Sequence, residues 1–452
     1  MKIQFGKGRR CINPQEPISL AGYFNRRVWT EVLDDLEVRA LVLKDGEKLA
    51  VILHFDILSI PHLLYSDIWE ALKKANIPSI SEENVIIAAT HTHTAPNTVA
   101  EPNSPAFRKY AAEKAAEALK EAMAEFKEGE VLSGLTSDIR FLFNRRYWMK
   151  DGRVVTNPGK LNKDILRPEG EVDPEIPMIA IQTKEGLEVL ITSIVNHTDT
   201  IGGCGVSADW PGFMRRKIEP AIAKGAMVIP MIGASGNINH FDNSTDMDQT
   251  CYAEPKRIGE GYAETILKAL PQLKPVSGEG IQMFTQKVIS GPRELDKEEV
   301  AQAQAVMDKY PEVDLEAASA KDLTSEDLAK GTPFALKYFA NALLKIANNT
   351  KKPEFLLSGI KFGDSTILAT LPSEPFVELG LTVRKEIFRN TLVLLSSHGN
   401  YNGGEGFFGG YIPNAWNYKR GGYEDTPRSS TYSVHTGALL MEGWRKLAEK
   451  FK

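Results

Sequence analysis

"NVIIAATHTHTAPNT", residues 84–98, begins as a run of apolar and small residues and ends in two histidines one residue apart. A short, nearly continuous apolar run is typical of a strand that is buried on both faces. Side chains at positions i and i+2 of an extended chain point the same way. We therefore expect a buried strand whose end presents His91 and His93 to one cavity.

Other apolar runs also end in polar clusters rather than in simple turns. They are KLAVILHFD (48–56), LEVLITSIVN (187–196), AMVIPMI (226–232), STILATLPS (365–373) and TLVLLSSHGN (391–400). Helical patterns lie among them, at SPAFRKYAAEKAAEALKEAMAEF (104–126), WPGFMRRKIEPAIAK (210–224) and PFVELGLTVRKEIFRN (375–390). Strands that alternate with helices indicate an α/β architecture, in which ligands gather beyond the carboxyl ends of the strands. We expect a layered sheet core flanked by helices, with the active site at the C-terminal ends of the strands.

Two segments depart from this alternation. Residues 293–349 are charged and rich in helix formers, which predicts a helical excursion from the core. Residues 399–433 show little periodicity and are rich in glycine and asparagine. A long irregular stretch in a compact protein is usually functional or disordered, and the many tyrosines of this one argue against disorder. These tyrosines are Tyr401, Tyr411, Tyr418, Tyr423 and Tyr432.

The composition excludes several classes of protein. The chain has 452 residues, a net charge of −5 and no basic stripe, so nucleic acid is not an expected partner. Its three cysteines form no C-x-x-C pair, which argues against a disulfide framework or a thiolate zinc site. It lacks the apolar core of a signal peptide and any apolar run of about 18 residues. We expect a cytoplasmic protein without a transmembrane segment, and the sequence does not indicate its oligomeric state.

The histidine pair has two interpretations. His91 and His93 suit a zinc site, or one metal ligand beside one proton-transfer group, and they equally suit a structural, hydrogen-bonded pair. His197 follows another apolar run, in NHTDTIGG, and this repetition favours a metal site. Asp199 or Asp209 would orient a ligand histidine, although Asp209 is also well placed to cap the helix that follows it. The other histidines considered, at positions 54, 62 and 240, are expected to be structural.

Glu374 lies at a strand-to-helix junction, in LPSEPFVELG. A carboxylate at that place is favoured by the helix dipole, so helix capping is one interpretation. The other is a third protein ligand, which would complete a His/His/Glu zinc site with one position open for water or substrate. The nearby loop GASGNINH (233–240) is suited to present backbone N–H groups to an anion, and a nucleophilic role of Ser235 is the alternative.

Together these segments resemble the catalytic domain of the neutral/alkaline (non-lysosomal) ceramidases. HTHTAP is similar to the H-T-H-S-G/A-P segment of that family, NHTDT with VSADWPGF to its second-histidine segment, and GASGNIN to its G-D-V-S loop. LPSEPFVELGLTVRKE resembles its P-G-E segment, and FNRR around Arg145 its N-R motif. GGYIPNAWNYKRGGYEDTPRSSTYSVHTG is similar to its G-Y-V-T-T … H-T segment. The matches occur in the same order and extend from near Arg39 to the last helix.

The resemblance implies a zinc-dependent hydrolase of a linear amide C–N bond, formed by one catalytic domain over residues 1–452. A zinc ion lowers the pKa of bound water from about 15.7 to about 7. The family's immunoglobulin-like C-terminal domain would begin near where the sequence stops, so we expect it to be absent. The implied zinc ligands are His91, His197, Glu374 and Tyr411, and the groups implied around the scissile carbonyl are His93 as proton carrier, with Arg145 and Tyr423 on the oxyanion.

The sequence also departs from the family. Asn97 and Thr98 replace the glycines after its histidine motif, and Asn237 replaces its loop aspartate. We expect neither a secretion signal nor an amphipathic helix suited to a membrane lipid. The amide substrate is therefore either lipid-like or a small molecule. The alternatives to an amidohydrolase are a metal-dependent hydrolase of an ester, phosphoester or sugar-derived substrate on the same scaffold, and a binding protein without catalysis.

Overall fold

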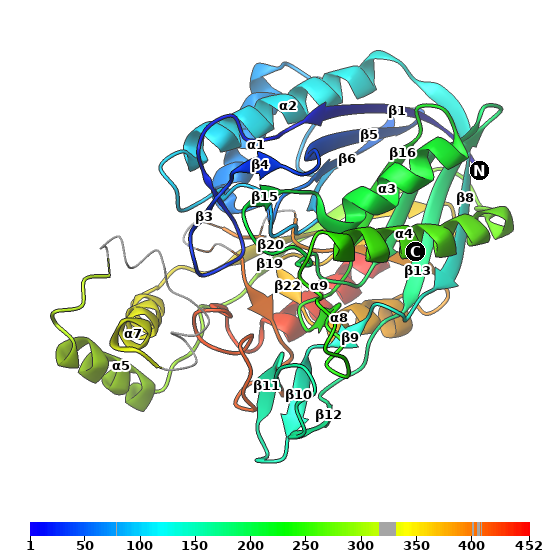
Figure 1. Cartoon of the computed structure of the whole chain (residues 1–452). Helices are drawn as coiled ribbons and strands as arrows, with labels where there is room; N and C mark the ends of the chain where they lie inside the picture. Colours follow the sequence, from blue (N-terminus) through cyan, green and yellow to red (C-terminus); the bar gives the residue numbers. More distant parts are fainter. Residues whose placement is uncertain (78, 316–330, 400–401, 405–406, 408) are drawn as a thin grey trace.

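Two β-sheets lie face to face at the centre of the fold (Figure 1). The computed structural model describes the whole chain except residues 78, 316–330, 400–401, 405–406 and 408. The larger sheet has the strand order β16-β14-β13-β8-β1-β5-β6-β7, with β18 beside β8. Its strands are β1 (Lys2–Cys11), β5 (Glu37–Asp45), β6 (Lys48–Phe55), β7 (Val85–Ala89), β8 (Lys127–Ser137), β13 (Glu175–Thr183), β14 (Gly186–Ile194), β16 (Met227–Ile232) and β18 (Lys274–Pro275).

The smaller sheet has the order β19-β20-β21-β23, with β24 beside β20. Its strands are β19 (Ile281–Ile289), β20 (Glu354–Phe362), β21 (Thr366–Thr370), β23 (Leu392–Ser396) and β24 (Asn402–Gly403). The short strands outside the two sheets are β2 (Ser19–Leu20), β3 (Arg27–Val28), β4 (Glu31–Val32), β9 (Phe143–Asn144), β10 (Arg146–Met149), β11 (Val154–Thr156), β12 (Ile165–Pro168), β15 (Gly205–Val206), β17 (Ile238–Asn239), β22 (Glu374–Pro375) and β25 (Tyr411–Ile412).

Parallel pairing within the two sheets is confined to β6 with β7, β14 with β16, and β21 with β23, among the strands that the structure describes. A helix connects the members of each pair: α1 (His62–Lys74), α3 (Asp209–Ile222), or α8 (Val377–Thr382) with the π-helical turn Val383–Ile387. These six strands are the six apolar runs of the sequence. Parallel strands buried on both faces need continuous apolar sequences, so these strands could be recognised in the sequence.

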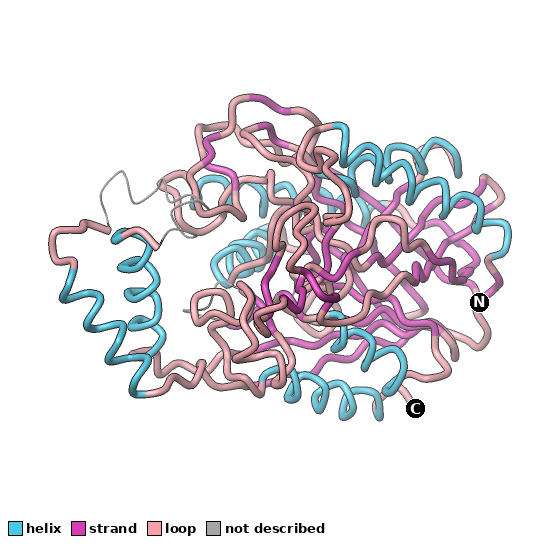
Figure 2. Tube along the Cα trace, turned by 60° about the horizontal axis from the view of Figure 1, so that its bottom comes forward, coloured by secondary structure: helices cyan, strands magenta, loops and turns pink. Residues whose placement is uncertain are grey.

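Buried side chains fill the space between the sheets and the space beneath the helices. Leu41, Ile52 and Ile191 of the larger sheet belong to one cluster with Phe362 and Leu394 of the smaller sheet. On the outer faces, α1 and α2 (Ser104–Ala124) cover one half of the larger sheet, and α3 and α4 (Ala253–Ala269) cover the other. The last helix, α9 (Thr436–Glu449), covers the smaller sheet (Figure 2). The predicted α/β layering is therefore confirmed.

The segment predicted as a helical excursion connects β19 to β20. It contains α5 (Lys297–Lys309) and α7 (Pro333–Ala347), which stand to one side of the sheets (Figures 1 and 2). Residues 316–330 of the predicted excursion lie outside the described residues. In the part of the chain that is described, no helix is both long enough and apolar enough to span a membrane.

A buried ion pair joins the end of β6 to α3. The two Arg215 Nη atoms lie 2.7 Å and 2.6 Å from the carboxylate oxygens of Asp56, and both side chains are nearly inaccessible to solvent. Burial opposes ionisation of Asp56, but Arg215 outweighs it and lowers the pKa of the carboxyl. Asp56 also accepts a hydrogen bond from the Glu37 N–H at 2.8 Å, so the pair fixes three elements of the larger sheet layer.

Replacing Arg215 by alanine should lower the free energy of unfolding by about 3–5 kcal/mol, because the Asp56 carboxylate is left buried without its partner. Urea unfolding followed by circular dichroism measures the loss. The matched control is Lys150→Ala, which removes an exposed ion pair with Asp164 (N···O 3.6 Å). That variant should change the free energy by about 0–1 kcal/mol. Equal losses in the two variants would contradict the structural role of the buried pair.

His54 should make the stability of the fold depend on pH. Its buried Nε2 donates to the Pro230 carbonyl at 3.0 Å, and burial lowers its pKa from 6.5 to about 4. The unfolded chain binds a proton at this histidine near its ordinary pKa, whereas the folded chain binds one only near pH 4. The contribution of His54 to the free energy of unfolding is therefore fully present above the ordinary pKa and is lost as the pH falls toward 4.

The variant His54→Gln keeps a donor for Pro230 but does not titrate. Between pH 7 and pH 4.5, the parent protein should lose about 2 kcal/mol more unfolding free energy than the variant. Urea unfolding at the two pH values measures the difference, and parallel losses would show that His54 does not contribute.

Candidate metal centre

His91 lies just beyond β7, in a backbone conformation that few residue types adopt. Its φ of 64° is in the left-handed region, which costs a residue other than glycine about 1–3 kcal/mol. The N–H of His91 donates to the Ile57 carbonyl at 2.9 Å, and its Nδ1 lies 2.7 Å from the Leu58 carbonyl. A carbonyl oxygen only accepts, so Nδ1 carries a proton. The strained turn therefore directs Nε2 of the imidazole inward.

Three imidazoles meet at their Nε2 atoms. The distance to His197 Nε2 is 3.2 Å from His91 and 3.2 Å from His93, and the distance between His91 and His93 is 3.4 Å. Backbone and side-chain bonds hold the two loops together, because the His93 N–H donates to the Thr198 carbonyl at 3.2 Å and Trp210 Nε1 donates to the His197 carbonyl at 2.9 Å. The structure thus brings together the three histidines that the sequence places after two separate strands.

Glu374 and Tyr411 reach the same place on paired strands. β22 and β25 are parallel, with Glu374 directly opposite Tyr411, and the Glu374 N–H donates to the Gly410 carbonyl at 3.0 Å. Glu374 Oε2 lies 3.4 Å from His91 Nε2 and has no hydrogen bond. A Cβ atom at position 236 would be 2.4 Å from the Glu374 carbonyl oxygen, so glycine is required where the loop after β16 passes this strand.

His398, which the sequence analysis did not single out, also reaches the cluster. Its ring stacks on that of His91, with centroids 3.8 Å apart and an interplanar angle of 19°. Both of its ring nitrogens are buried without a hydrogen-bond partner. His91, Glu374 and His398 form a second group of potential ligands beside His91, His93 and His197. The available signal was the apolar run 391–400, which ends in a histidine as two other runs do.

Burial controls the charges of the cluster. It lowers the pKa of His93 to about 4 and that of His197 well below its ordinary value, so both rings are neutral. Burial opposes ionisation of Glu374, but His91 and Arg145 outweigh it and lower the pKa of the carboxyl. The cluster therefore places imidazole nitrogens beside an ionised carboxylate.

This donor set fits a divalent metal ion. The three Nε2 atoms lie within 3.4 Å of one another, and Glu374 Oε2 is buried without a hydrogen bond. A cation bound between them would use these nitrogens and this oxygen as ligands. Tetrahedral zinc with Zn–N bonds of about 2.0–2.1 Å separates neighbouring ligand atoms by about 3.3–3.4 Å, close to the observed Nε2 distances. Imidazole and carboxylate donors also accept other divalent ions.

Arg145 is held behind the ring of Tyr411. Its Nε donates to Glu424 at 2.8 Å, its Nη2 donates to the Gly236 carbonyl at 2.8 Å, and its Cζ lies 5.1 Å from the centroid of the Tyr411 ring. Arg145 is buried, so it is not part of a surface ion pair. It does not line the cavity that opens onto the histidines. Tyr423 does line that cavity, and its ring lies edge-on to Tyr411 with centroids 5.6 Å apart.

Of the two aspartates considered for orienting a histidine, Asp199 is the one that faces a ring. Its Oδ1 lies 3.8 Å from His93 Nδ1 and accepts a hydrogen bond from the Tyr23 hydroxyl at 2.5 Å. Asp209 instead accepts from the backbone N–H groups of Trp210 (2.6 Å) and Thr200 (3.0 Å). Asp209 therefore lies in the first turn of α3 and bonds to nearby backbone, while the N-cap of the helix is Ala208 rather than Asp209.

The loop 233–240 has a different role from the predicted one. The N–H groups of Gly233, Gly236 and Ile238 donate to the carbonyls of Ile194, Pro375 and Ser235 at 2.9–3.0 Å, so these three are not available to an anion. Asn237 Oδ1 accepts from the Val377 N–H at 2.8 Å, at the start of α8. Ser235 is fully buried and does not line the cavity, which is unfavourable for a nucleophile. The loop fastens the segment that carries Glu374.

A cavity of about 380 Å³ opens onto the cluster. The loop before β3 forms one wall, and the irregular segment after β24 forms the opposite wall. Gly22 brings the first wall close to the histidines, since a Cβ atom there would be 2.2 Å from His93 Nδ1, and its φ is +91°. The described lining residues are Gly22, Tyr23, Phe24, Leu58, His91, His93, Glu374, Phe407, Gly409, Gly410, Tyr411, Tyr423, Arg428, Ser429 and Thr431.

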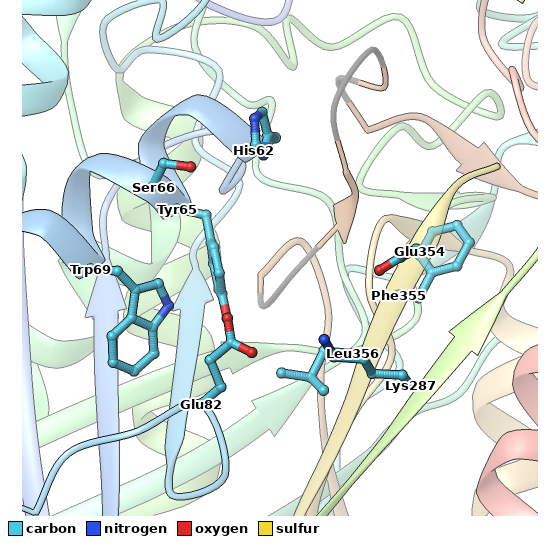
Figure 3. A pocket seen from close by; sticks show the side chains of 9 residues that line it. All are labelled: His62, Tyr65, Ser66, Trp69, Glu82, Lys287, Glu354, Phe355 and Leu356. Carbon is cyan, nitrogen blue, oxygen red and sulfur yellow. The ribbon is translucent and has the colours of Figure 1, made fainter. Parts of the chain in front are cut away.

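A second cavity, of about 440 Å³, lies between α1 and the strands β19 and β20 (Figure 3). Tyr65 and Trp69 extend into it from the helix, and Lys287 and Glu354 from the strands. It contains none of the residues predicted for the site. The cavity at the histidines is therefore the candidate for chemistry.

Comparison with known proteins identifies the fold. No protein-family model and no curated protein sequence matches the chain. Among solved structures, it is similar to one described as "Ceramidase complexed with C2" and to the neutral ceramidase from Pseudomonas aeruginosa. Each similarity has a TM-score of 0.71 at 16% sequence identity, and it covers 99% and 100% of this chain and 75% of the other. The predicted resemblance is thus confirmed for the fold.

The cluster should bind one divalent ion per chain. We expect His197→Ala to weaken zinc binding by at least about 100-fold, because removal of outer partners of metal ligands already costs about 10–100-fold. Competition titration with a chelating zinc indicator, together with elemental analysis, measures affinity and stoichiometry. The control is His435→Ala, which removes an exposed histidine outside the cluster. Unchanged zinc binding by the His197 variant would contradict a metal centre here.

Proposed function

We propose that this protein is a zinc-dependent hydrolase that cleaves an N-acyl or other linear amide bond. The observation that carries the proposal is the meeting of the three Nε2 atoms and the Glu374 carboxylate at the floor of a cavity. The proposal is supported by the fold, which is shared with structures named as ceramidases. Ceramidases by name act on ceramide, an amide, and amide hydrolysis suits a centre of this composition.

The metal would be held by His91, His197 and Glu374, with Tyr411 opposite Glu374 as a further ligand. His91 is the residue that the two groups of potential ligands, one with His197 and one with Glu374, have in common. When bound, it would acidify a water molecule and polarise the carbonyl of the substrate. The position of the metal is set by the protein side chains that would bind it. His91 is fixed by its bond to the Leu58 carbonyl, and Glu374 is fixed by its strand pairing.

We assign proton transfer to His93. The Nε2 distances do not separate His93 from the other two histidines, because all three lie within 3.4 Å. The difference is at Nδ1. His91 Nδ1 is bonded to a backbone carbonyl, whereas His93 Nδ1 faces Asp199 across 3.8 Å beside the cavity. An imidazole that is backed by a carboxylate and open to the cavity can accept a proton and pass it to the leaving amine.

Tyr423 and Arg145 have different roles, because only Tyr423 lines the cavity. Tyr423 lines the cavity, so its hydroxyl can donate to an oxyanion there. Arg145 packs over Tyr411 and is anchored to Glu424, so we assign it the task of orienting Tyr411. It acts as a positioning residue rather than as a direct contact with the substrate.

A panel of substrates tests the reaction class. The zinc-loaded protein should hydrolyse N-acyl amides, including a short-chain ceramide or simple N-acyl alkylamines, faster than the matching esters and phosphoesters relative to their uncatalysed rates. Turnover of esters or phosphoesters alone would assign the same centre to the alternative hydrolase. Absence of turnover for every class, with zinc bound, would overturn the proposal.

The variant His93→Gln separates proton transfer from metal binding. It should retain one zinc ion per chain and lose about 100- to 10,000-fold in kcat, because general acid–base catalysis typically contributes that much. Steady-state kinetics and elemental analysis of the same preparation measure the two quantities. Loss of zinc together with activity would instead make His93 a ligand, which the short Nε2 distances would then explain.

A further inference from the structure

Arg428 places a positive charge in the wall of the cavity. Among the described lining residues, Arg428 is the one arginine or lysine, and Glu374 is the one carboxylate. Arg428 belongs to the irregular segment beside the centre, and the carbonyl of the next residue, Ser429, accepts from the Tyr411 N–H at 2.8 Å. The guanidinium is therefore carried by a segment that is tied directly to a candidate metal ligand.

The guanidinium is held by aromatic groups rather than by acids. Its Nε and Nη2 donate to the Tyr338 hydroxyl at 3.1 Å and 2.9 Å. Its Cζ lies 4.5 Å from the centroid of the Phe24 ring and 5.1 Å from that of Tyr338. Tyr338 is part of α7, whose Phe339 also packs against Phe24. The helical excursion thus reaches the cavity and orients Arg428.

Arg428 has no carboxylate partner within the described part of the chain, since its polar contacts there are the two bonds to Tyr338. Two buried arginines beside the site and in the core differ in this respect. Arg145 and Arg215 are each bonded to a carboxylate, with N···O distances of 2.8 Å and 2.6 Å. A guanidinium has five N–H donors, and the neutral Tyr338 hydroxyl and the rings of Phe24 and Tyr338 do not neutralise its charge. Arg428 is therefore oriented toward the cavity with unused donors.

The size and lining of the cavity restrict what this charge can bind. A volume of about 380 Å³ is at the lower end of ligand pockets, which span about 300–1,000 Å³. The described lining is aromatic and polar, and Leu58 is its one aliphatic side chain. Such a cavity suits a small polar molecule better than a long alkyl chain. One guanidinium balances the single charge of a carboxylate, whereas a phosphate carries about −1.5 to −2.

We infer that Arg428 binds a carboxylate of the substrate, so that the substrate is a small amide acid rather than a neutral lipid. The inference rests on the proposed amide hydrolysis for the identity of the scissile bond. The carboxylate is recognised through paired N–H···O bonds, the geometry that suits a guanidinium fork. Arg428 is then a specificity residue, positioned by Tyr338 of the excursion.

The test compares acids with neutral isosteres. The probes are N-hexanoylglycine and N-butylsuccinamate, which carry the carboxylate on the amine side and on the acyl side, and their neutral partners N-ethylhexanamide and N-butylbutanamide. At least one acid should exceed its neutral partner in kcat/KM by about 10–100-fold for the zinc-loaded full chain, as a charge-assisted hydrogen bond predicts. The ratio should fall to about 1 in Arg428→Gln, mainly through KM, and recover partly in Arg428→Lys.

The matched control is Arg445→Gln, which removes an exposed arginine far from the cavity lining and should keep the parental ratio. Circular dichroism and zinc content verify that each variant is folded and loaded. Equal kcat/KM for acid and neutral amides in the parent protein would overturn the inference while leaving amide hydrolysis intact. Preference for N-acetylaminomethylphosphonate over N-acetylglycine would overturn the assignment to a carboxylate.

A binding measurement separates this inference from the proposed function. Calorimetric titration of N-hexanoylglycine into the zinc-loaded protein should show binding that is weakened by about 10–100-fold in Arg428→Gln but not in Arg445→Gln. If no amide is hydrolysed and this difference persists, the proposed function fails and the carboxylate site stands. If amides are hydrolysed and the variants bind the acid equally, the inference about Arg428 fails.

Discussion

The approach of three imidazole nitrogens to within 3.4 Å of one another, with a carboxylate oxygen 3.4 Å from one of them, is the constraint on which the rest of the structure depends. The fold must hold these buried polar groups in place. It does so with strained backbone at His91, Ser373 and His398, whose φ values of 64°, 65° and 62° lie in the left-handed region. Each lies just beyond a strand of a parallel pair. Such strain persists only where surrounding packing and hydrogen bonds determine the conformation.

The two packed sheets supply that rigidity. Parallel pairs from both sheets direct their C-terminal ends to one place, and contacts such as the Ser397 N–H to the Ile232 carbonyl (2.7 Å) connect the two sheets there. Behind the centre, Glu424 accepts from Arg145 and Arg146 at 2.8 Å each. This buried network, whose charges are paired, holds Arg145 over the ring of Tyr411. The charged groups that hold the site are thereby kept apart from Arg428, whose charge is available to a ligand.

The sequence predicted those features of the fold and site that depend on a short stretch of neighbouring residues. The six apolar runs are strands because parallel strands covered on both faces need continuous apolar sequence. His91 and His197 were found because each follows such a run directly. The antiparallel strands β1, β5, β8, β13, β19 and β20 were less visible, since their register is set by neighbours distant in sequence. The sequence could not show that some N–H groups of loop 233–240 are already bonded, because a partner such as Pro375 is contributed by a strand distant in sequence.

The sequence by itself determined the α/β class, the strand ends at which function would lie and the residue types of a metal centre, because apolar periodicity and residue chemistry are local properties. The tertiary structure decided which groups meet. It added His398 to the cluster, placed Arg145 behind Tyr411 instead of in the cavity, and selected Asp199 over Asp209 as the carboxylate facing His93. It also brought Tyr338 of the excursion to Arg428. These contacts join residues far apart along the chain, and only the packing of one sheet on the other determines them.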